Sequence, residues 1–173
     1  MKKVLVALGL LMAFGPAFSY TLEISEEELQ SRLTEMMPME HQALFVSVVL
    51  SSPDIDLTVG NNEIGFSSNV EVVVPGGLKG TGSSKVTGSL SYEPSKGAFY
   101  VSQPKIVDLK AENVPPQFTQ QAKEIAQVAV SQFLSTRPIF VLSDKDLKQQ
   151  MVKAVLKSVK VENNLLLVEL DPF

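Results

Sequence analysis

The chain has 173 residues, which suits one domain with a substantial core and would be cramped for two. Apolar residues make up 45% of it and charged residues 20%, so a folded globular protein is expected rather than a disordered one. The net charge of -4 argues against nucleic acid as a partner, because that partner requires clustered lysine and arginine. The absence of cysteine excludes disulfides, thiol nucleophiles and cysteine-ligated metals.

Residues 1–19 have the pattern of a signal peptide. Two lysines precede an apolar run over residues 4–14, which Gly15-Pro16 interrupts. Ala17 and Ser19 place small residues where the signal protease requires them, so we expect cleavage after Ser19 and export to the periplasm. The alternative is a membrane anchor, but a spanning helix needs about 20 apolar residues and this run is shorter.

The remaining chain, residues 20–173, is expected to form a single α+β domain that begins with a short helix. Ser25 and Glu28 have the S-x-x-E spacing of a capping box, in which each side chain satisfies a free backbone N–H group of the other residue. The cluster Met36–Met39 is either gap-filling core or an adaptable lip beside a ligand opening. An apolar stripe and a terminating proline complete the helix: Leu29, Leu33, Met36 or Met37, and Pro38.

Between about Leu44 and Leu109 the apolar period changes from 3.6 to 2, which predicts four antiparallel strands in hairpin order. The first strand starts at Leu44, and its apolar parity switches at Pro53, so a bulge or sharp bend is expected there. Pro104 likewise indicates an edge or a bulge in the fourth strand. The second strand alternates cleanly and should have one wet face; its apolar positions are Ile64, Phe66, Val70, Val72 and Val74.

The longest helix is expected over residues 115–136. Pro115 and Pro116 suit a helix start, and Pro138 bars continuation. On a helical wheel one arc is apolar: Phe118, Ala122, Ile125, Ala126, Ala129, Val130 and Phe133. The opposite arc is polar: Gln120, Glu124, Gln127 and Ser131. Because alanine fills the middle of the apolar arc, either the sheet comes very close there or something else occupies the space.

The C-terminal part should contain one more short strand, a helix and a hairpin. The strand is expected within residues 138–142, and Ser143 to Asp146 should cap a helix with Leu147, Met151 and Val155 on one side. Residues 157–170 have the pattern of a hairpin that turns at asparagines, which tolerate positive φ.

No catalytic or metal-binding constellation stands out in the sequence. His41 is the one histidine, and we interpret it as an ordinary residue between the first helix and the first strand. The glycine-rich segment 76–82 lacks the spacing of a phosphate loop. Asp54 and Asp56 share a face, as in a calcium or acid/base site, but a solvated strand edge is the simpler interpretation. We therefore expect a non-enzymatic protein without cofactor or metal.

The order of elements resembles the YceB-like family of bacterial envelope lipoproteins. The resemblance covers essentially the whole chain after residue 19 and is carried by Thr21–Leu29, Val114-Pro115 and Ser158–Leu165. It implies a TULIP-like fold, in which a curved antiparallel β-sheet wraps around one long α-helix and a lipid or another apolar molecule can lie between them. The chain has no lipobox cysteine, so acylation and a stable membrane anchor are not expected.

Two functions are therefore considered. The first is a periplasmic binder or carrier whose partner is a lipid or fatty-acid-like ligand held between sheet and long helix. The second is a structural or protein-interaction module of the envelope with a filled core and no small ligand. For the first, the expected ligand-binding residues are Phe118, Ala122, Ile125, Ala126, Ala129, Phe133, Phe66, Val70 and Val72.

Overall fold

The computed structural model describes residues 21–60 and 62–170, so the expected signal peptide and its cleavage site lie outside the described residues. Its elements in chain order are β1 (Thr21–Ser25), α1 (Glu26–Met36), β2 (Met39–Ala43), β3 (Val46–Asp56), β4 (Glu63–Val74), β5 (Leu78–Glu93), β6 (Ala98–Glu112), α2 (Pro116–Thr136), β7 (Phe140–Val141), α3 (Leu147–Val155), β8 (Leu156–Glu162) and β9 (Leu165–Leu170).

Six strands form one antiparallel sheet in sequence order, β2-β3-β4-β5-β6-β7. A second sheet of three strands, β1-β9-β8, brings the first and last described strands together. The expected class, a mixed α+β fold with a large antiparallel sheet and few helices, is confirmed. The large sheet is not closed, because β2 and β7 are its edges, and its wrapping around α2 stays a prediction.

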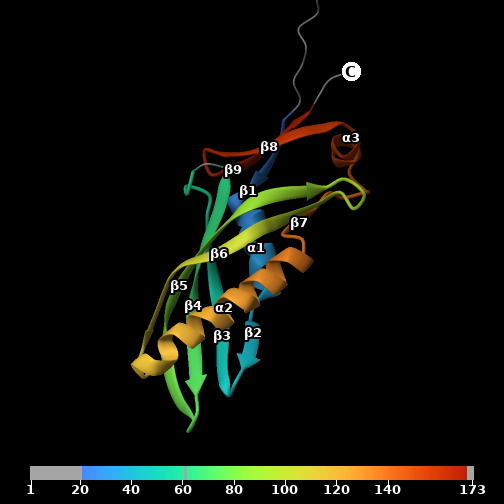
Figure 1. Cartoon of the computed structure of the whole chain (residues 1–173). Helices are drawn as coiled ribbons and strands as arrows, with labels where there is room; N and C mark the ends of the chain where they lie inside the picture. The colour runs from blue at the N-terminus through green and yellow to red at the C-terminus, as the bar shows by residue number, and fades with distance from the viewer. Residues whose placement is uncertain (1–20, 61, 171–173) are drawn as a thin grey trace, which may run out of the picture.

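Both α1 and α2 lie on the inner face of the large sheet (Figure 1). α1 packs mainly on β3, and α2 packs on β6, β3 and β2. The small sheet and α3 lie at the opposite end of the molecule from the β2–β3 and β4–β5 turns (Figure 1). The inner face of the large sheet therefore forms the core together with the apolar faces of the two longer helices.

The sequence predicted both of these helices well. Ser25 caps α1 in a complete capping box, since its hydroxyl accepts from the Glu28 N–H and the Glu28 carboxylate accepts from the Ser25 N–H. α2 begins at Pro116 and ends at Thr136, within one residue of the expected range. The bulge expected in β3 is also present, because its register with β4 shifts between Ser51 and Asp54.

A glutamine of α1 fills the gap that the β3 bulge leaves in the sheet. The Gln30 amide nitrogen donates to the Pro53 carbonyl at 2.6 Å, and its carbonyl oxygen accepts from the Ile55 N–H at 2.8 Å. The same amide nitrogen also donates to the Thr34 hydroxyl, one turn further along the helix. Ser52, before the proline, has φ 49°. The side chain thus provides hydrogen-bond partners for two backbone groups of β3 at the bulge.

The same arrangement occurs a second time between α2 and β6. The Gln127 amide donates to the Pro104 carbonyl at 2.7 Å and accepts from the Ile106 N–H at 2.9 Å. It also donates to Ser131, one turn further along the helix, and Gln103 before the proline again has φ 49°. We name these two contacts the glutamine clamps, and each ties the middle of a helix to a bulged strand.

Several expectations about individual residues were wrong. Gln127 was placed on the solvent face of the long helix, but it is half-buried because it serves the bulge in β6. Leu44 was expected in a strand, yet it lies in the β2–β3 turn and is 79% exposed. Leu147 and Met151 were expected to share an apolar side of the third helix with Val155, but both are exposed, at 76% and 69%, while Val152 is buried. β1 and β2 were not expected as strands.

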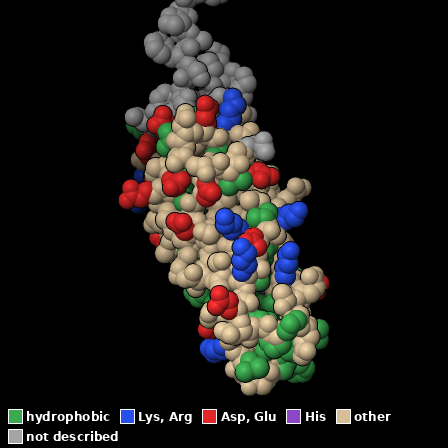
Figure 2. Space-filling model, turned by 90° about the vertical axis from the view of Figure 1, so that its left-hand side faces the viewer, with side chains coloured by type: hydrophobic (Ala, Val, Ile, Leu, Met, Phe, Trp, Pro, Cys, Tyr) green, Lys and Arg blue, Asp and Glu red, His purple; other side chains and the backbone are tan. Residues whose placement is uncertain are grey.

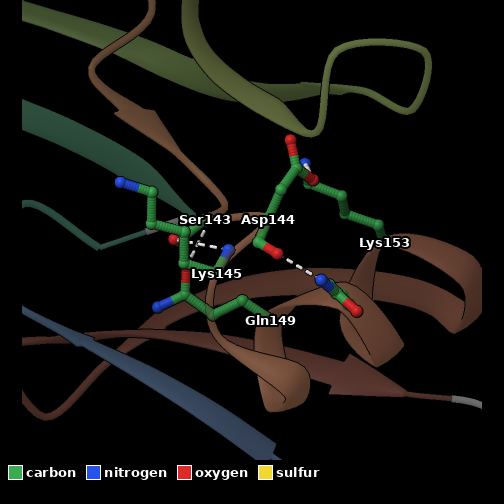
Figure 3. A network of polar contacts seen from close by, with 6 residues as sticks. Ser143, Asp144, Lys145, Gln149 and Lys153 are labelled. Carbon is green, nitrogen blue, oxygen red and sulfur yellow. Dashed lines mark hydrogen bonds and ion pairs between the residues drawn. The ribbon is translucent and has the colours of Figure 1, made fainter.

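A polar network holds the start of α3 (Figure 3). The Gln149 side chain accepts from the Ser143 N–H at 2.5 Å, the Ser143 hydroxyl accepts from the Lys145 N–H at 3.1 Å, and Lys153 pairs with Asp144. The stem of Lys153 also lies against Gly97 in the β5–β6 turn. The network therefore joins α3 to that end of the large sheet.

Candidate functional site

The nine expected ligand-binding residues all lie on the inner side of the fold. Ala122, Ala126 and Ala129, which we call the alanine strip, are at most 1% exposed. Ile125 is 4% exposed, and the two phenylalanines of α2 are half-buried against the core. The three residues expected on the sheet are buried on β4: Phe66, Val70 and Val72.

The helix and sheet portions of this predicted site come from α2 and β4, and β4 is not one of the strands on which α2 mainly packs. α2 packs mainly on β6, β3 and β2, whereas the expected sheet residues come from β4. The alanine strip is small enough to allow this close approach of helix and sheet, and it is covered by protein. A groove lined by all nine residues therefore stays a prediction.

A hollow of about 190 Å³ opens instead between the edge strand β2 and the first half of α2. We call it the β2–α2 seam, and its lining residues are His41, Ala43, Leu44, Gln121, Glu124, Ile125 and Val128. Its surface is mostly apolar, with His41, Gln121 and Glu124 as the polar side chains. Ile125 is the residue that it shares with the nine expected ones, and Ile125 lies on the buried face of α2 beside the alanine strip.

Sequence reasoning missed this seam because it missed β2. His41 was interpreted as part of a connection, but it lies in β2 opposite Val48 and is half-buried. Alternation over the short run Met39–Ala43 was the available signal, since Met39 is buried and Glu40 is exposed. The polar residues at positions 40–42 concealed the strand.

A larger and more polar hollow of about 560 Å³ lies between the end of α2 and the hairpin of β5 and β6. Tyr92 lines it, its ring contacts the Phe99 ring in a tilted arrangement with centroids 4.8 Å apart, and burial raises the pKa of its hydroxyl. Lys96 lies over the Tyr100 ring and pairs with Glu93 at 3.0 Å. The lining of this hollow is half polar, and its lysine and glutamate form an ion pair with each other.

The two aspartates noted in the sequence line a third hollow of about 250 Å³ on the outer face of the sheet. The Asp56 carboxylate accepts from the Thr58 hydroxyl at 2.5 Å and from its N–H at 2.8 Å, and these bonds lower the pKa of Asp56. Within residues 21–60 and 62–170, no three histidine, cysteine, aspartate or glutamate side chains are grouped as metal ligands.

None of the helices in the described part of the chain combines the length and the apolar character that crossing a membrane requires.

Together these features define a mixed α+β protein built on one open antiparallel sheet, with an apolar seam between its edge strand and its longest helix. The chain belongs to a family described as "Protein of unknown function (DUF1439)", whose model matches residues 24–164. A comparison with curated proteins gave no match.

Proposed function

We propose that this protein is a non-enzymatic binder or carrier of a lipid or another apolar molecule in the periplasm, and that the ligand enters through the β2–α2 seam. The observation that carries the proposal is the seam itself, where apolar lining opens to solvent directly beside the alanine strip. Apolar pockets with a few polar groups at the rim are the usual form of sites for such ligands.

The seam is the place where sheet and helix can most easily separate. β2 has five residues and pairs with β3 on one side only, so local opening there breaks few hydrogen bonds. The clamp from Gln127 holds α2 to β6 near the middle of the helix. The first half of α2 can therefore move away from β2 while the helix stays attached to the sheet.

Opening is needed because the seam is small. Pockets for whole ligands typically hold roughly 300–1,000 Å³, and the seam holds about 190 Å³. An alkyl chain that widened the seam would contact Ile125 first and then the alanine strip. The small side chains of the strip leave room for an alkyl chain. The resemblance to the YceB-like family and to TULIP-like proteins supports a ligand in this position.

The second candidate is a protein-interaction module with a filled core. Its support is the alanine strip, because side chains at most 1% exposed leave no surface for a ligand in the closed form. The two candidates therefore differ in whether the β2–α2 seam opens.

The test is binding of a fluorescent fatty-acid probe to the delipidated protein and to two matched variants. Val128→Trp places an indole in the seam, and Val128 is 42% exposed, so the fold should tolerate it. Val107→Trp is the control, because Val107 is 50% exposed and lines the hollow on the outer face of the sheet. We expect Val128→Trp to weaken probe binding at least about tenfold and Val107→Trp to leave it unchanged.

Equal probe affinities for the two variants would show that the ligand does not bind at the seam. No probe binding by the parent protein would favour the filled-core module instead.

A further inference from the structure

Three connections between elements, together with the residues around them, contain no aspartate, glutamate, lysine or arginine: residues 41–53, 72–78 and 113–122. Other stretches of the chain also lack charged residues, and what these three share is their place in the fold. Each segment contains a connection between elements, namely the β2–β3 turn, the β4–β5 turn and the stretch from β6 into α2.

The three connections meet at one end of the molecule. Ser47 of β3 pairs with Val73 of β4, so the turns that precede and follow these residues lie side by side. Thr81 of β5 pairs with Glu112 of β6, and Val114 lies against Gly80, which places the start of α2 at the same end. Figure 2 shows hydrophobic side chains gathered there, at the lower end of the view.

The most exposed apolar side chains of this end are Phe45 at 81%, Leu44 at 79% and Leu78 at 57%, and we call these three residues the apolar tip. Leu44 and Phe45 are the central residues of a two-residue turn and have φ 48° and 69°. Turns with positive φ at both positions favour asparagine and glycine, because larger side chains are strained there. The chain thus combines backbone strain with full exposure of two large apolar side chains.

We infer that the apolar tip docks on a lipid bilayer by inserting Phe45, Leu44 and Leu78 between the headgroups. This inference goes beyond the proposed function and does not depend on it. The three connections at this end contain no charged residues, and the interior of a bilayer disfavours charged groups. The turns also suit it because their backbone is internally bonded, as where the Gly77 N–H donates to the Val74 carbonyl at 3.1 Å.

A bilayer suits the tip better than a second protein molecule. Three side chains on two projecting turns bury far less than the ~800 Å² per partner of a stable interface. Acyl chains and headgroups rearrange around an inserted ring, so a bilayer needs no preformed cavity for Phe45. Since no charge lies in the three segments, zwitterionic lipid should suffice and salt should have little effect.

The chain contains no tryptophan, so single tryptophan variants report on one place each. Phe45→Trp tests the tip, and Leu147→Trp is the matched control, because Leu147 is 76% exposed on α3 at the other end of the molecule (Figure 1). With phosphatidylcholine vesicles we expect a blue shift of the Phe45→Trp emission and its quenching by brominated lipid. Leu147→Trp emission should not change.

Vesicle flotation measures binding of variants that remove apolar side chains from the tip. Phe45→Gly relieves the strain at φ 69° and should keep the fold, and Leu78→Ser alters the neighbouring turn. Neither residue lines the β2–α2 seam, so failure here is distinct from failure of the proposed function. Each variant should bind vesicles at least about tenfold more weakly than the parent, while Leu147→Ser should bind like the parent.

Equal behaviour of Phe45→Gly and Leu147→Ser, or no vesicle binding by the parent, would overturn the inference. A blue shift of the Phe45→Trp emission that grows with protein concentration and needs no lipid would overturn it in favour of self-association.

Discussion

Replacing Gln127 by leucine tests whether the glutamine clamps hold the helices to the sheet. The wild-type amide donates to the Pro104 carbonyl and accepts from the Ile106 N–H, and Pro104 lies where the register of β6 with β5 shifts. Leucine has nearly the same size but no polar atom, so it should leave both backbone groups unpaired beneath the helix.

The expected cost follows from these two groups. An unsatisfied buried polar group costs about 1–3 kcal/mol, and a part-buried one lies toward the lower end, so the loss should be roughly 2–4 kcal/mol. For a chain of this length each kcal/mol shifts the melting temperature by about 2–4 °C. We therefore expect Gln127→Leu to melt about 4–16 °C below the parent.

The assay is thermal and urea unfolding followed by circular dichroism, with Gln120→Leu as control. Gln120 lies on the same helix, is exposed, and bonds to Glu124 rather than to the sheet, so its loss should stay within about 0.5 kcal/mol. Gln30→Leu should resemble Gln127→Leu, and the two losses should add because the clamps share no residue. Equal midpoints for Gln127→Leu and Gln120→Leu would refute the role of the clamp.

Two further predictions concern the turns and the pH dependence. The double change Leu44→Asn with Phe45→Gly should raise the free energy of unfolding in urea by about 1–2 kcal/mol, because it relieves strain at two positive φ values; a decrease would show that these side chains support the fold. Asp56 has a lowered pKa because it accepts from the Thr58 hydroxyl and N–H, so its stabilisation is present above the unfolded-state pKa and is lost as pH falls through the folded one. Asp56→Asn should therefore flatten the acid side of the stability profile, and an unchanged profile would contradict this.

Local signals in the sequence were sufficient for the helices and the β3 bulge. The capping box at Ser25, the prolines around α2 and the parity switch at Pro53 each act within a few residues, so they can be recognised without tertiary information. The two asparagines of the last hairpin have positive φ, as expected for that turn.

The missed elements depend on partners far away in the chain. β1 is a strand because it pairs with β9, and its own five residues give no indication of that partner. Gln127 has its sheet partners at residues 104 and 106, so a helical wheel alone placed it in solvent. One signal was available: Ser-x-Pro-x-Ile occurs at residues 51–55 and 102–106, where the two clamped bulges lie.

The buried face of α2 could be predicted from the sequence, whereas the strands that cover it could not. The apolar face of α2 was assigned correctly, and its alanines and Ile125 are buried as that pattern requires. The sheet residues expected to face it were taken from the most regular strand, β4, whereas the helix packs mainly on β6, β3 and β2. Periodicity identifies which face is buried but carries no information on which strand covers it.

The central claim, that an apolar ligand enters between β2 and α2, is tested most directly by native mass spectrometry of protein purified from its own envelope fraction, followed by solvent extraction. We expect a bound apolar adduct at one per chain, which is absent from Val128→Trp and retained by Val107→Trp. Protein that carries no adduct in any variant, and that also fails to take up the fatty-acid probe after extraction, would contradict the account.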